Sequence, residues 1–283
     1  KIYALGVIIL DIIFQNNDAN RSLPGGAVFN TIVSLSRMNA KCNMITCTGD
    51  DQISQIFSDF CMQNNIDTHH ILKSSECQSM LALAFIAPQT KYQFYGSIPF
   101  NTILQNAPYI KNDDILFLGD FITLDQQYLP IYQKLISNSP LVYFDPNIRN
   151  TVNQQLITLI HEADILRLSE EDLTNINLDM SQLKNEVVIV TDIQYVKYKI
   201  QETYGVVEIM EKIKPISTIG AGDSFNAGFL FKMQEFGVDK TNFVQIMKNK
   251  IVEFINFGVQ CAQHVCMRTE NYVEVGFNVL SMF

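Results

Sequence analysis

The residues best suited to chemistry lie between Ser217 and Gly228, in the run S-T-I-G-A-G-D-S-F-N-A-G. Gly220 and Gly222 let the backbone approach an anion closely, and the free N–H groups and positive dipole of the helix predicted to follow favour a phosphate. A carboxylate at Asp223 is electrostatically unfavourable there unless it accepts the proton of an attacking hydroxyl. The same pattern also describes an ordinary turn before a helix, so a second site must support this interpretation.

A second turn of this kind lies in the N-terminal quarter, in the run L-P-G-G-A-V-F-N that ends at Asn30. It follows an apolar strand, with Asp11 at the strand's carboxyl end. The acceptor-only carboxylate of Asp11 suits vicinal hydroxyls, and the Asn30 amide can both donate and accept. Each residue also has a structural interpretation: Asp11 as a turn residue, and Asn30 as a helix position facing water.

Short β-branched runs alternate with longer helical patterns, which predicts a mostly parallel sheet covered by helices, an α/β fold. Ligands bind such sheets beyond the carboxyl ends of the strands. The predicted buried strands are Ile2–Ile9, Asn43–Thr46, Ile115–Leu118, Leu141–Phe144, Asp164–Leu168 and Val187–Val190. The predicted helices are Ala27–Met38, Asp51–Asn64, Leu124–Ile136, Asn153–His161, Asp223–Glu235 and Thr241–His264. The segments Ser79–Ala87 and Lys91–Tyr95 instead predict an antiparallel hairpin in a half-exposed sheet.

Composition narrows the class of protein. A chain of 283 residues with 47% hydrophobic content can fill a sizeable core. The net charge of -9, with no run of Lys and Arg, argues against nucleic acid as a partner. The six cysteines form no C-x-x-C pair, which suits a reducing cytoplasm. The apolar run from Ile2 to Phe14 is interrupted by Asp11 and is too short for a membrane span, so we expect a cytoplasmic protein without a membrane partner.

Taken together, the two turns resemble those of the PfkB carbohydrate kinases, the ribokinase-like family. Further landmarks appear in the family's order over nearly the whole chain. The segment D-P-N-I-R ending at Arg149 is similar to one found in the fructokinase and ketodeoxygluconate kinase branches. The run from Ser169 to Asp172 occupies the place of the family's N-x-x-E element, and Val187–Thr191 resembles the strand before its nucleotide loop.

The resemblance implies one ribokinase-like three-layer domain over residues 1–283, with a small β-sheet lid formed by about residues 11–23 and 78–100. In related kinases the lid closes over the sugar and often packs against another subunit's lid, which implies a homodimer. It also implies ATP-dependent phosphorylation of a hydroxyl of fructose, a related ketose or a sugar acid. In that reaction Asp223 is the base, and the backbone of Gly220, Ala221 and Gly222 contributes the anion hole.

The resemblance also implies binding residues. Those for the sugar are Asp11, Gly25, Gly26, Asn30 and Arg149. Those for the nucleotide are Thr191, Thr218, Gly220, Gly222 and Asn256. Arg149 could contact an anionic substrate group or the transferred phosphate, or could be a structural salt-bridge partner; Asn256 could be an ordinary helix-surface residue.

ATP and Mg²⁺ are the implied cofactors, and a monovalent cation is left open. Mg²⁺ neutralises adjacent phosphates and usually keeps several waters, so few protein ligands are required. Asp172 is the candidate that orients the hydrated ion through water. The pattern S-x-x-D that ends at Asp172 is also typical of a helix capping box.

The chain departs from the family pattern at several positions. The run T-D-I-Q-Y from Thr191 lacks the usual glycines of the nucleotide loop, Ser169 replaces an asparagine, and Ser217 replaces an aspartate. Two alternatives therefore stand beside the sugar kinase: a noncatalytic sugar-binding regulatory protein and a nucleoside kinase. The retained Asp223 argues against the first, and the D-P-N-I-R segment favours the sugar branches over the second.

Overall fold

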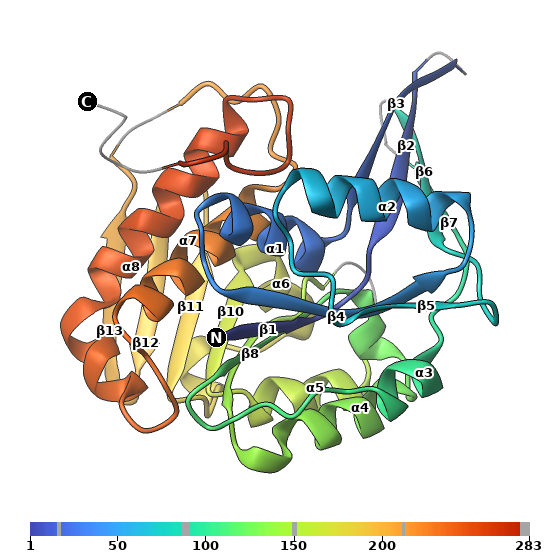
Figure 1. The fold of residues 1–283 in the computed structure, drawn as a ribbon. Coiled ribbons are helices and arrows are strands. Elements are labelled where there is room, and N and C mark those ends of the chain that lie inside the picture. Colours follow the sequence, from blue (N-terminus) through green and yellow to red (C-terminus); the bar gives the residue numbers. More distant parts are fainter. Residues whose placement is uncertain (16–17, 87–90, 149–151, 211–212, 278–283) are drawn as a thin grey trace.

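The computed structural model describes residues 1–15, 18–86, 91–148, 152–210 and 213–277 (Figure 1). In these residues one large sheet is built from β1 (Ile2–Leu5), β4 (Cys42–Gly49), β5 (Ile71–Ser74), β8 (Ile115–Gly119), β9 (Leu141–Asp145), β10 (Ile165–Ser169), β11 (Val187–Thr191), β12 (Tyr195–Ile200) and β13 (Thr203–Glu208). Its strand order is β13-β12-β11-β10-β9-β8-β1-β4-β5. Neighbours from β11 to β5 run parallel, and β12 and β13 add an antiparallel edge.

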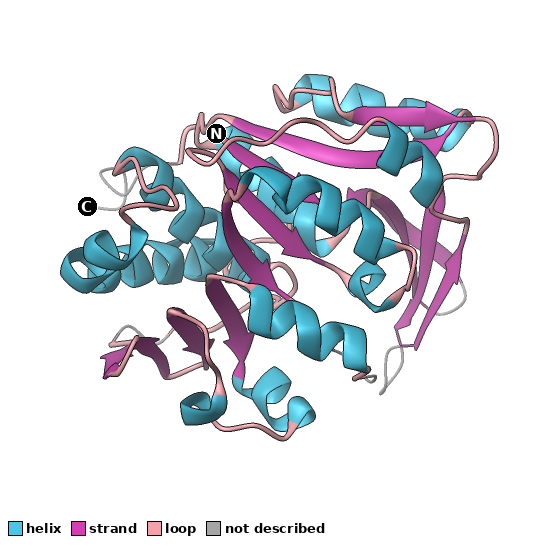
Figure 2. Cartoon of the chain, turned by 90° about the horizontal axis from the view of Figure 1, so that it is seen from below, coloured by secondary structure: helices cyan, strands magenta, loops and turns pink. Residues whose placement is uncertain are grey.

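Helices cover both faces of this sheet (Figures 1 and 2). One layer contains α1 (Ala27–Arg37), α2 (Gln52–Gln63), α7 (Ala221–Glu235) and α8 (Phe243–Cys266). The other contains α3 (Phe100–Gln105), α4 (Tyr128–Leu135), α5 (Gln154–Glu162) and α6 (Glu170–Ile176). Short 3-10 turns are η1 (Phe121–Leu124), η2 (Ile136–Asn138) and η3 (Met180–Gln182).

The central strand β8 is apolar throughout because both of its faces are buried. In β8, Ile115 and Phe117 pack in the cluster under α1 and α7, while Leu116 and Leu118 pack in the cluster under α4 and α5. Successive side chains of a strand point to opposite faces, so each layer takes every second residue. The predicted three-layer α/β fold is confirmed.

A second, smaller sheet projects beside the large one (Figure 1). It contains β2 (Ile9–Gln15), β3 (Asp18–Gly25), β6 (Met80–Ile86) and β7 (Lys91–Tyr95), in the order β3-β2-β6-β7. The predicted hairpin is confirmed, because β6 and β7 pair antiparallel with Leu81 opposite Tyr95. Phe94 of this hairpin contacts Phe121, which follows β8, with ring centroids 5.7 Å apart.

The prediction of one strand over Ile2–Ile9 was wrong. The large-sheet strand ends at Leu5, and the strand that begins at Ile9 belongs to the small sheet. The chain leaves the large sheet at Gly6, where a Cβ atom would lie 2.5 Å from the Asp120 carboxylate. The connecting residues are as buried and apolar as the strands, so the sequence pattern does not reveal the break. Asp11 therefore lies within β2 rather than at the carboxyl end of a core strand.

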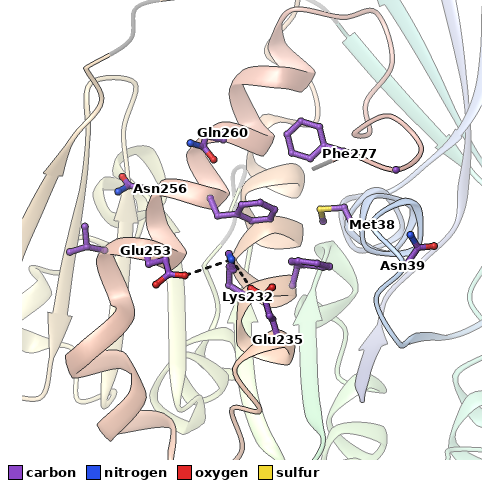
Figure 3. Close-up of a pocket in the computed structure, with 12 residues that line it drawn as sticks. Met38, Asn39, Lys232, Glu235, Glu253, Asn256, Gln260 and Phe277 are labelled. Carbon is purple, nitrogen blue, oxygen red and sulfur yellow. Dashed lines mark hydrogen bonds and ion pairs between the residues drawn. The ribbon is translucent and has the colours of Figure 1, made fainter. Parts of the chain in front are cut away.

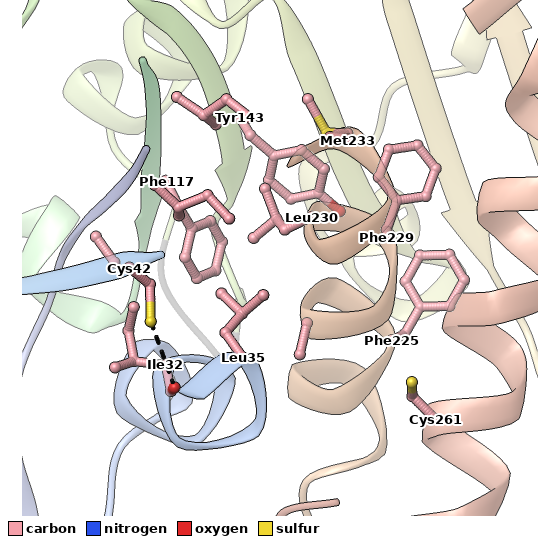
Figure 4. Close-up of a cluster of buried hydrophobic side chains, with 14 of the residues drawn as sticks. Ile32, Leu35, Cys42, Phe117, Tyr143, Phe225, Phe229, Leu230, Met233 and Cys261 are labelled. Carbon is pink, nitrogen blue, oxygen red and sulfur yellow. Dashed lines mark hydrogen bonds between the residues drawn. The ribbon is translucent and has the colours of Figure 1, made fainter. Parts of the chain in front are cut away.

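An aromatic cluster fixes the position of α7 against the sheet (Figure 4). The Tyr143 ring on β9 packs between Phe117, at a centroid distance of 5.7 Å, and Phe229 of α7, at 5.9 Å. The Tyr143 hydroxyl donates to Oδ1 of Asn226 over 2.9 Å. The helix whose first turn carries Asp223 is thus held by packing and by a buried hydrogen bond. Within the described ranges, no helix has the length and apolar character that a membrane crossing requires.

Candidate active site

The first turn of α7 has the features of an anion site. Gly220 precedes the helix with φ 81, a left-handed conformation that favours glycine, and a Cβ atom there would lie 2.6 Å from the carbonyl oxygen of Asn271. No side chain among the described residues caps this end. Helix N-termini leave their first N–H groups without intrahelical partners. The Ala221 N–H donates to the Thr218 carbonyl oxygen over 3.3 Å, so the N–H groups of Gly222 and Asp223 are the ones that can receive an anion.

Asp223 is held against α1 by two contacts. Nδ2 of buried Asn30 donates a hydrogen bond of 2.7 Å to Oδ2 of Asp223. The Thr31 hydroxyl lies 3.1 Å from the Asp223 backbone oxygen. The carboxylate is therefore fixed in orientation at the junction of two helices that begin at glycine-rich turns.

The electrostatic environment prepares Asp223 to exchange a proton near neutral pH. Burial raises the pKa of its carboxyl to about 7, and the nearby carboxylates of Asp145 and Asp120 act in the same direction. The hydrogen bond from Asn30 and the charge of Arg167 act in the opposite direction. A base whose pKa lies near the working pH combines the unprotonated state with a useful proton affinity.

The sugar-side residues predicted from the sequence lie next to this carboxylate. A Cβ atom added at Gly25 would overlap Oδ2 of Asp11 and would lie 3.9 Å from Oδ1 of Asn30. Gly26 has φ 109, and its Cβ atom would lie 2.5 Å from the backbone oxygen of Val7. Asp11, Gly25, Asn30 and Asp223 thus form one contiguous group. Oδ1 of Asn30 is buried without a hydrogen-bond partner among the described residues.

Asp120 braces the group and was not predicted. Its carboxylate accepts hydrogen bonds from the backbone N–H of Val7, at 2.9 Å, and of Val28, at 3.2 Å. Its own backbone is left-handed, with φ 68, which is uncommon outside glycine. Asp120 therefore ties the link between the two sheets to the start of α1. The sequence offered only an acid after a buried strand, which is also typical of a turn.

A cavity of about 930 Å³ lies beside the α7 N-terminus, between the β11–β12 hairpin and α8. Its walls include Thr191, Thr218, Ala221 and Gly222, so four of the residues predicted to contact phosphate or nucleotide line one space. Small-molecule sites typically occupy 300–1,000 Å³.

Asn256 does not line this cavity. It borders a different recess, of about 770 Å³, together with Lys232 and Phe277 (Figure 3). Lys232 is paired there with Glu235 at 2.6 Å and Glu253 at 3.7 Å. The structure therefore separates Asn256 from Thr191, Thr218 and Gly222, whereas Gly220 precedes the lining residue Ala221 without lining the cavity itself. Apolar residues occur on several faces of α8, so the sequence pattern does not show which face of this helix borders the cavity.

Beneath the cavity lies a buried polar network that the sequence analysis missed. Nη1 of Arg167 donates to Oδ2 of Asp145 over 2.9 Å, and Nη2 donates to the Thr191 hydroxyl over 2.6 Å. Nδ2 of Asn226 donates to the same Asp145 oxygen over 2.5 Å. The predicted Arg149 lies outside the described residues. The one sequence signal for this network is that Arg167 is a charged residue inside the otherwise apolar start of β10.

Asp172 serves as a structural residue in this geometry. With Ser169 it forms the capping box of α6, in which its Oδ2 accepts from the Ser169 N–H at 2.8 Å and from the Ser169 hydroxyl at 2.6 Å. Its Oδ1 accepts from the Ile148 N–H at 2.7 Å. The described residues contain no group of three or more His, Cys, Asp or Glu side chains that could hold a metal. The residues present therefore do not form a protein cage for Mg²⁺.

Comparison with known proteins decides the family. The model described as pfkB family carbohydrate kinase matches residues 15–273. The chain belongs to the pfkB family of carbohydrate kinases. It is accordingly a sugar kinase, a phosphotransferase. Among curated relatives of this pfkB kinase, fructokinase-1 of Zea mays is 24% identical over 267 residues, which cover 84% of this chain and 80% of the relative.

Solved structures share the fold of this pfkB kinase. A fructokinase from Xylella fastidiosa with bound ATP gives a TM-score of 0.85 at 18% identity, covering 99% of this chain and 97% of that one. The fructokinase of Vibrio cholerae O395, bound to fructose, ADP and calcium, gives a TM-score of 0.83 at 17% identity, covering 99% of this chain and 96% of that one. Aminoimidazole riboside kinase of Salmonella enterica, complexed with aminoimidazole riboside and an ATP analog, gives a TM-score of 0.81 at 17% identity, covering 98% of this chain and 96% of that one. At these identities the likeness shows the ribokinase-like fold.

Proposed function

We propose that this pfkB kinase transfers the terminal phosphate of ATP to a hydroxyl of fructose or of a related ketose or sugar acid, with Asp223 as the general base. The observation that carries the proposal is the position of Asp223. It stands at an uncapped helix N-terminus, is hydrogen-bonded to Asn30, and has a pKa raised to about 7 by burial.

The reaction follows from the placement of the two substrates around α7. The sugar lies on the side of Asp11, Gly25 and Asn30, and the nucleotide occupies the cavity lined by Thr191 and Gly222. The attacking hydroxyl gives its proton to Asp223 as its oxygen bonds to phosphorus and the bond to the ADP oxygen breaks. Backbone N–H groups of the first turn stabilise the charge on the transferred phosphoryl group.

The small sheet is proposed as a lid over the sugar, since β2 contributes Asp11 and β3 contributes Gly25. We also propose that two copies associate through it. Tyr92, Phe94 and Tyr95 of β7 are each exposed by 43% or more, an unusual concentration of aromatic surface on one strand. Light scattering of the wild type against Phe94→Ser tests this, and a monomeric wild type would refute it.

Metal use is proposed through the nucleotide. The related Vibrio cholerae fructokinase has been solved with ADP and calcium and, as a double mutant, with ADP and potassium. Because this chain shows no protein cage among its described residues, Mg²⁺ would be bound chiefly by the phosphates and water.

The deciding experiment measures ADP release with ATP and Mg²⁺ over a panel of ketoses, aldoses, sugar acids and ribosides, for the wild type and Asp223→Asn. Sugar-dependent turnover that disappears in the folded variant is the expected result. Sugar binding without turnover by the wild type would instead favour the noncatalytic sugar-binding protein.

The riboside or nucleoside kinase is the second enzymatic candidate. It is favoured by the structural similarity to aminoimidazole riboside kinase at a TM-score of 0.81. Turnover that requires a base attached to the ribose would establish it. Turnover with free fructose would exclude it as the principal activity.

A further inference from the structure

We propose that Arg167 contacts the phosphoryl group that is transferred, and so is a catalytic residue of this kinase. The inference rests on the proposed function, because it requires ATP in the cavity beside α7. It concerns a side chain that comes from β10, far in sequence from the glycine-rich turn, and its support is independent of the turn's sequence pattern.

The first support is position. Arg167 lines the cavity together with Thr191 and Gly222. A Cβ atom at Gly222 would lie 3.2 Å from Nη1 and 3.3 Å from Nη2 of Arg167, so the guanidinium lies directly beside the first turn of α7. A phosphate held by the N–H groups of that turn is therefore within reach of the same guanidinium.

The second support is charge. Among the described residues that line this cavity, Arg167 is the single cationic side chain, while Asp192 and Glu208 are acidic. The chain as a whole carries a formal net charge of -9. A polyphosphate entering this space meets one fixed positive charge, and that charge lies at the end where transfer occurs.

The third support is the cost of holding Arg167 where it is. The residue is only 8% exposed, and its Nε is buried with no hydrogen-bond partner among the described residues. Its recorded side-chain bonds go to Asp145 and Thr191, one from each terminal nitrogen. A guanidinium has five N–H donors, so donors remain for a ligand. A buried guanidinium whose Nε lacks a partner is costly to hold. The second N–H of each terminal nitrogen remains for a phosphate oxygen, an acceptor that planar guanidinium groups bind well.

Asp145 and Thr191 orient this guanidinium. The Asp145 carboxylate accepts a hydrogen bond from Nη1, and the Thr191 hydroxyl, at the end of β11, accepts one from Nη2. Pre-oriented donors stabilise developing charge without reorganising during the reaction.

The test compares ATP with ADP binding by calorimetry, and turnover, in three variants. Arg167→Gln combined with Asp145→Asn removes the buried pair together, which avoids an uncompensated charge. Arg167→Lys keeps the positive charge but removes the planar set of guanidinium N–H donors. Lys232→Gln removes one positive charge from α7, at the separate recess, and is the matched control.

In the double variant we expect the affinity for ATP to fall by about tenfold or more while that for ADP changes little, and kcat to fall by about 100- to 1,000-fold. Arg167→Lys should recover part of kcat, and Lys232→Gln should match the wild type. Equal losses for ATP and ADP, or unchanged kcat in a folded double variant, would overturn the inference. If the wild type binds ATP without turning over any acceptor, the proposed function fails, and the difference between ATP and ADP binding still decides the role of Arg167.

Discussion

The side-chain nitrogen of Asn30 donates a 2.7 Å hydrogen bond to the carboxylate of Asp223, although 193 positions separate the two residues. This bond joins the two glycine-led helices at their first turns. It places a group that can contact a sugar hydroxyl beside the group that would remove the proton.

Replacing Asp223 by Asn should reduce kcat by about 100- to 10,000-fold, the usual contribution of a general base. The Asn30 bond and the helix turn should survive, because asparagine has nearly the same shape. Steady-state kinetics and circular dichroism of both proteins check this. Full activity in the variant would exclude the proposed base.

Activity should increase with pH and level off near pH 7. Burial raises the pKa of the Asp223 carboxyl to about 7, and only the unprotonated form accepts a proton. Below this value kcat/KM should fall about tenfold per pH unit. A pH profile of kcat/KM measures the pKa in the free enzyme, and a midpoint near 4 would contradict the assigned environment.

Stability should show the opposite dependence on pH. The folded-state pKa of Asp223 is raised above the ordinary carboxyl value of 3.8, so folding favours the protonated carboxyl. This contribution is fully present below about pH 4 and is lost as pH rises through about 7. We therefore expect the unfolding free energy of the wild type, measured in urea relative to that of Asp223→Asn, to be lower at pH 8 than at pH 5. An unchanged difference would count against a buried carboxyl.

Removing the Asn30 amide should shift the activity profile to higher pH. The hydrogen bond from Asn30 lowers the pKa of Asp223, so Asn30→Ala should raise the midpoint and also increase KM for the sugar. Ser36→Ala is the control on the same helix, because Ser36 bonds instead to the backbone oxygen of Asn64. A midpoint that stays at the wild-type value would show that this bond does not tune the base.

Comparing Gly220→Ala with Gly237→Ala separates the cost of a positive φ from the cost of a steric clash of the new Cβ atom. Both glycines have positive φ, 81 and 62, but a Cβ atom would meet Asn271 at Gly220 and nothing within 4 Å at Gly237. Gly237→Ala should cost about 1–2 kcal/mol. Gly220→Ala should cost clearly more and also reduce activity, because the turn proposed to bind phosphate must move. Equal unfolding free energies for the two variants would contradict the tight contact with Asn271.

The residues that sequence reasoning placed well are those whose local motif fixes their geometry. A glycine-rich turn before a helix determines where N–H groups point, so the surroundings of Gly220 and Asp223 could be anticipated. The capping interpretation of Asp172 was likewise confirmed, because a capping box involves residues three positions apart.

Residues whose role depends on distant partners could not be located in the same way. At Gly6, where the first strand has ended, a Cβ atom would collide with Asp120 and Val28, both remote in sequence. Arg167 acquires its position from Asp145 and Thr191 on neighbouring strands. The antiparallel hairpin β12–β13 was also missed, because Lys197 and Lys199 interrupt the apolar residues of β12. Lys199 is nevertheless buried, and its Nζ donates to the distant Leu183 carbonyl oxygen.

The pairing of β2 with β6 has a consequence for the order of folding. These two strands run parallel, with Ile9 opposite Met80 and Phe14 opposite Phe85, so the centre of the small sheet joins segments separated by α1, β4, α2 and β5. Such non-local pairs form slowly because a long loop must close first. On the ribosome, Asp11 can pair with Ala82 of β6 only after that residue has emerged, so the half of the site proposed to bind sugar cannot form before the chain has been made through β6.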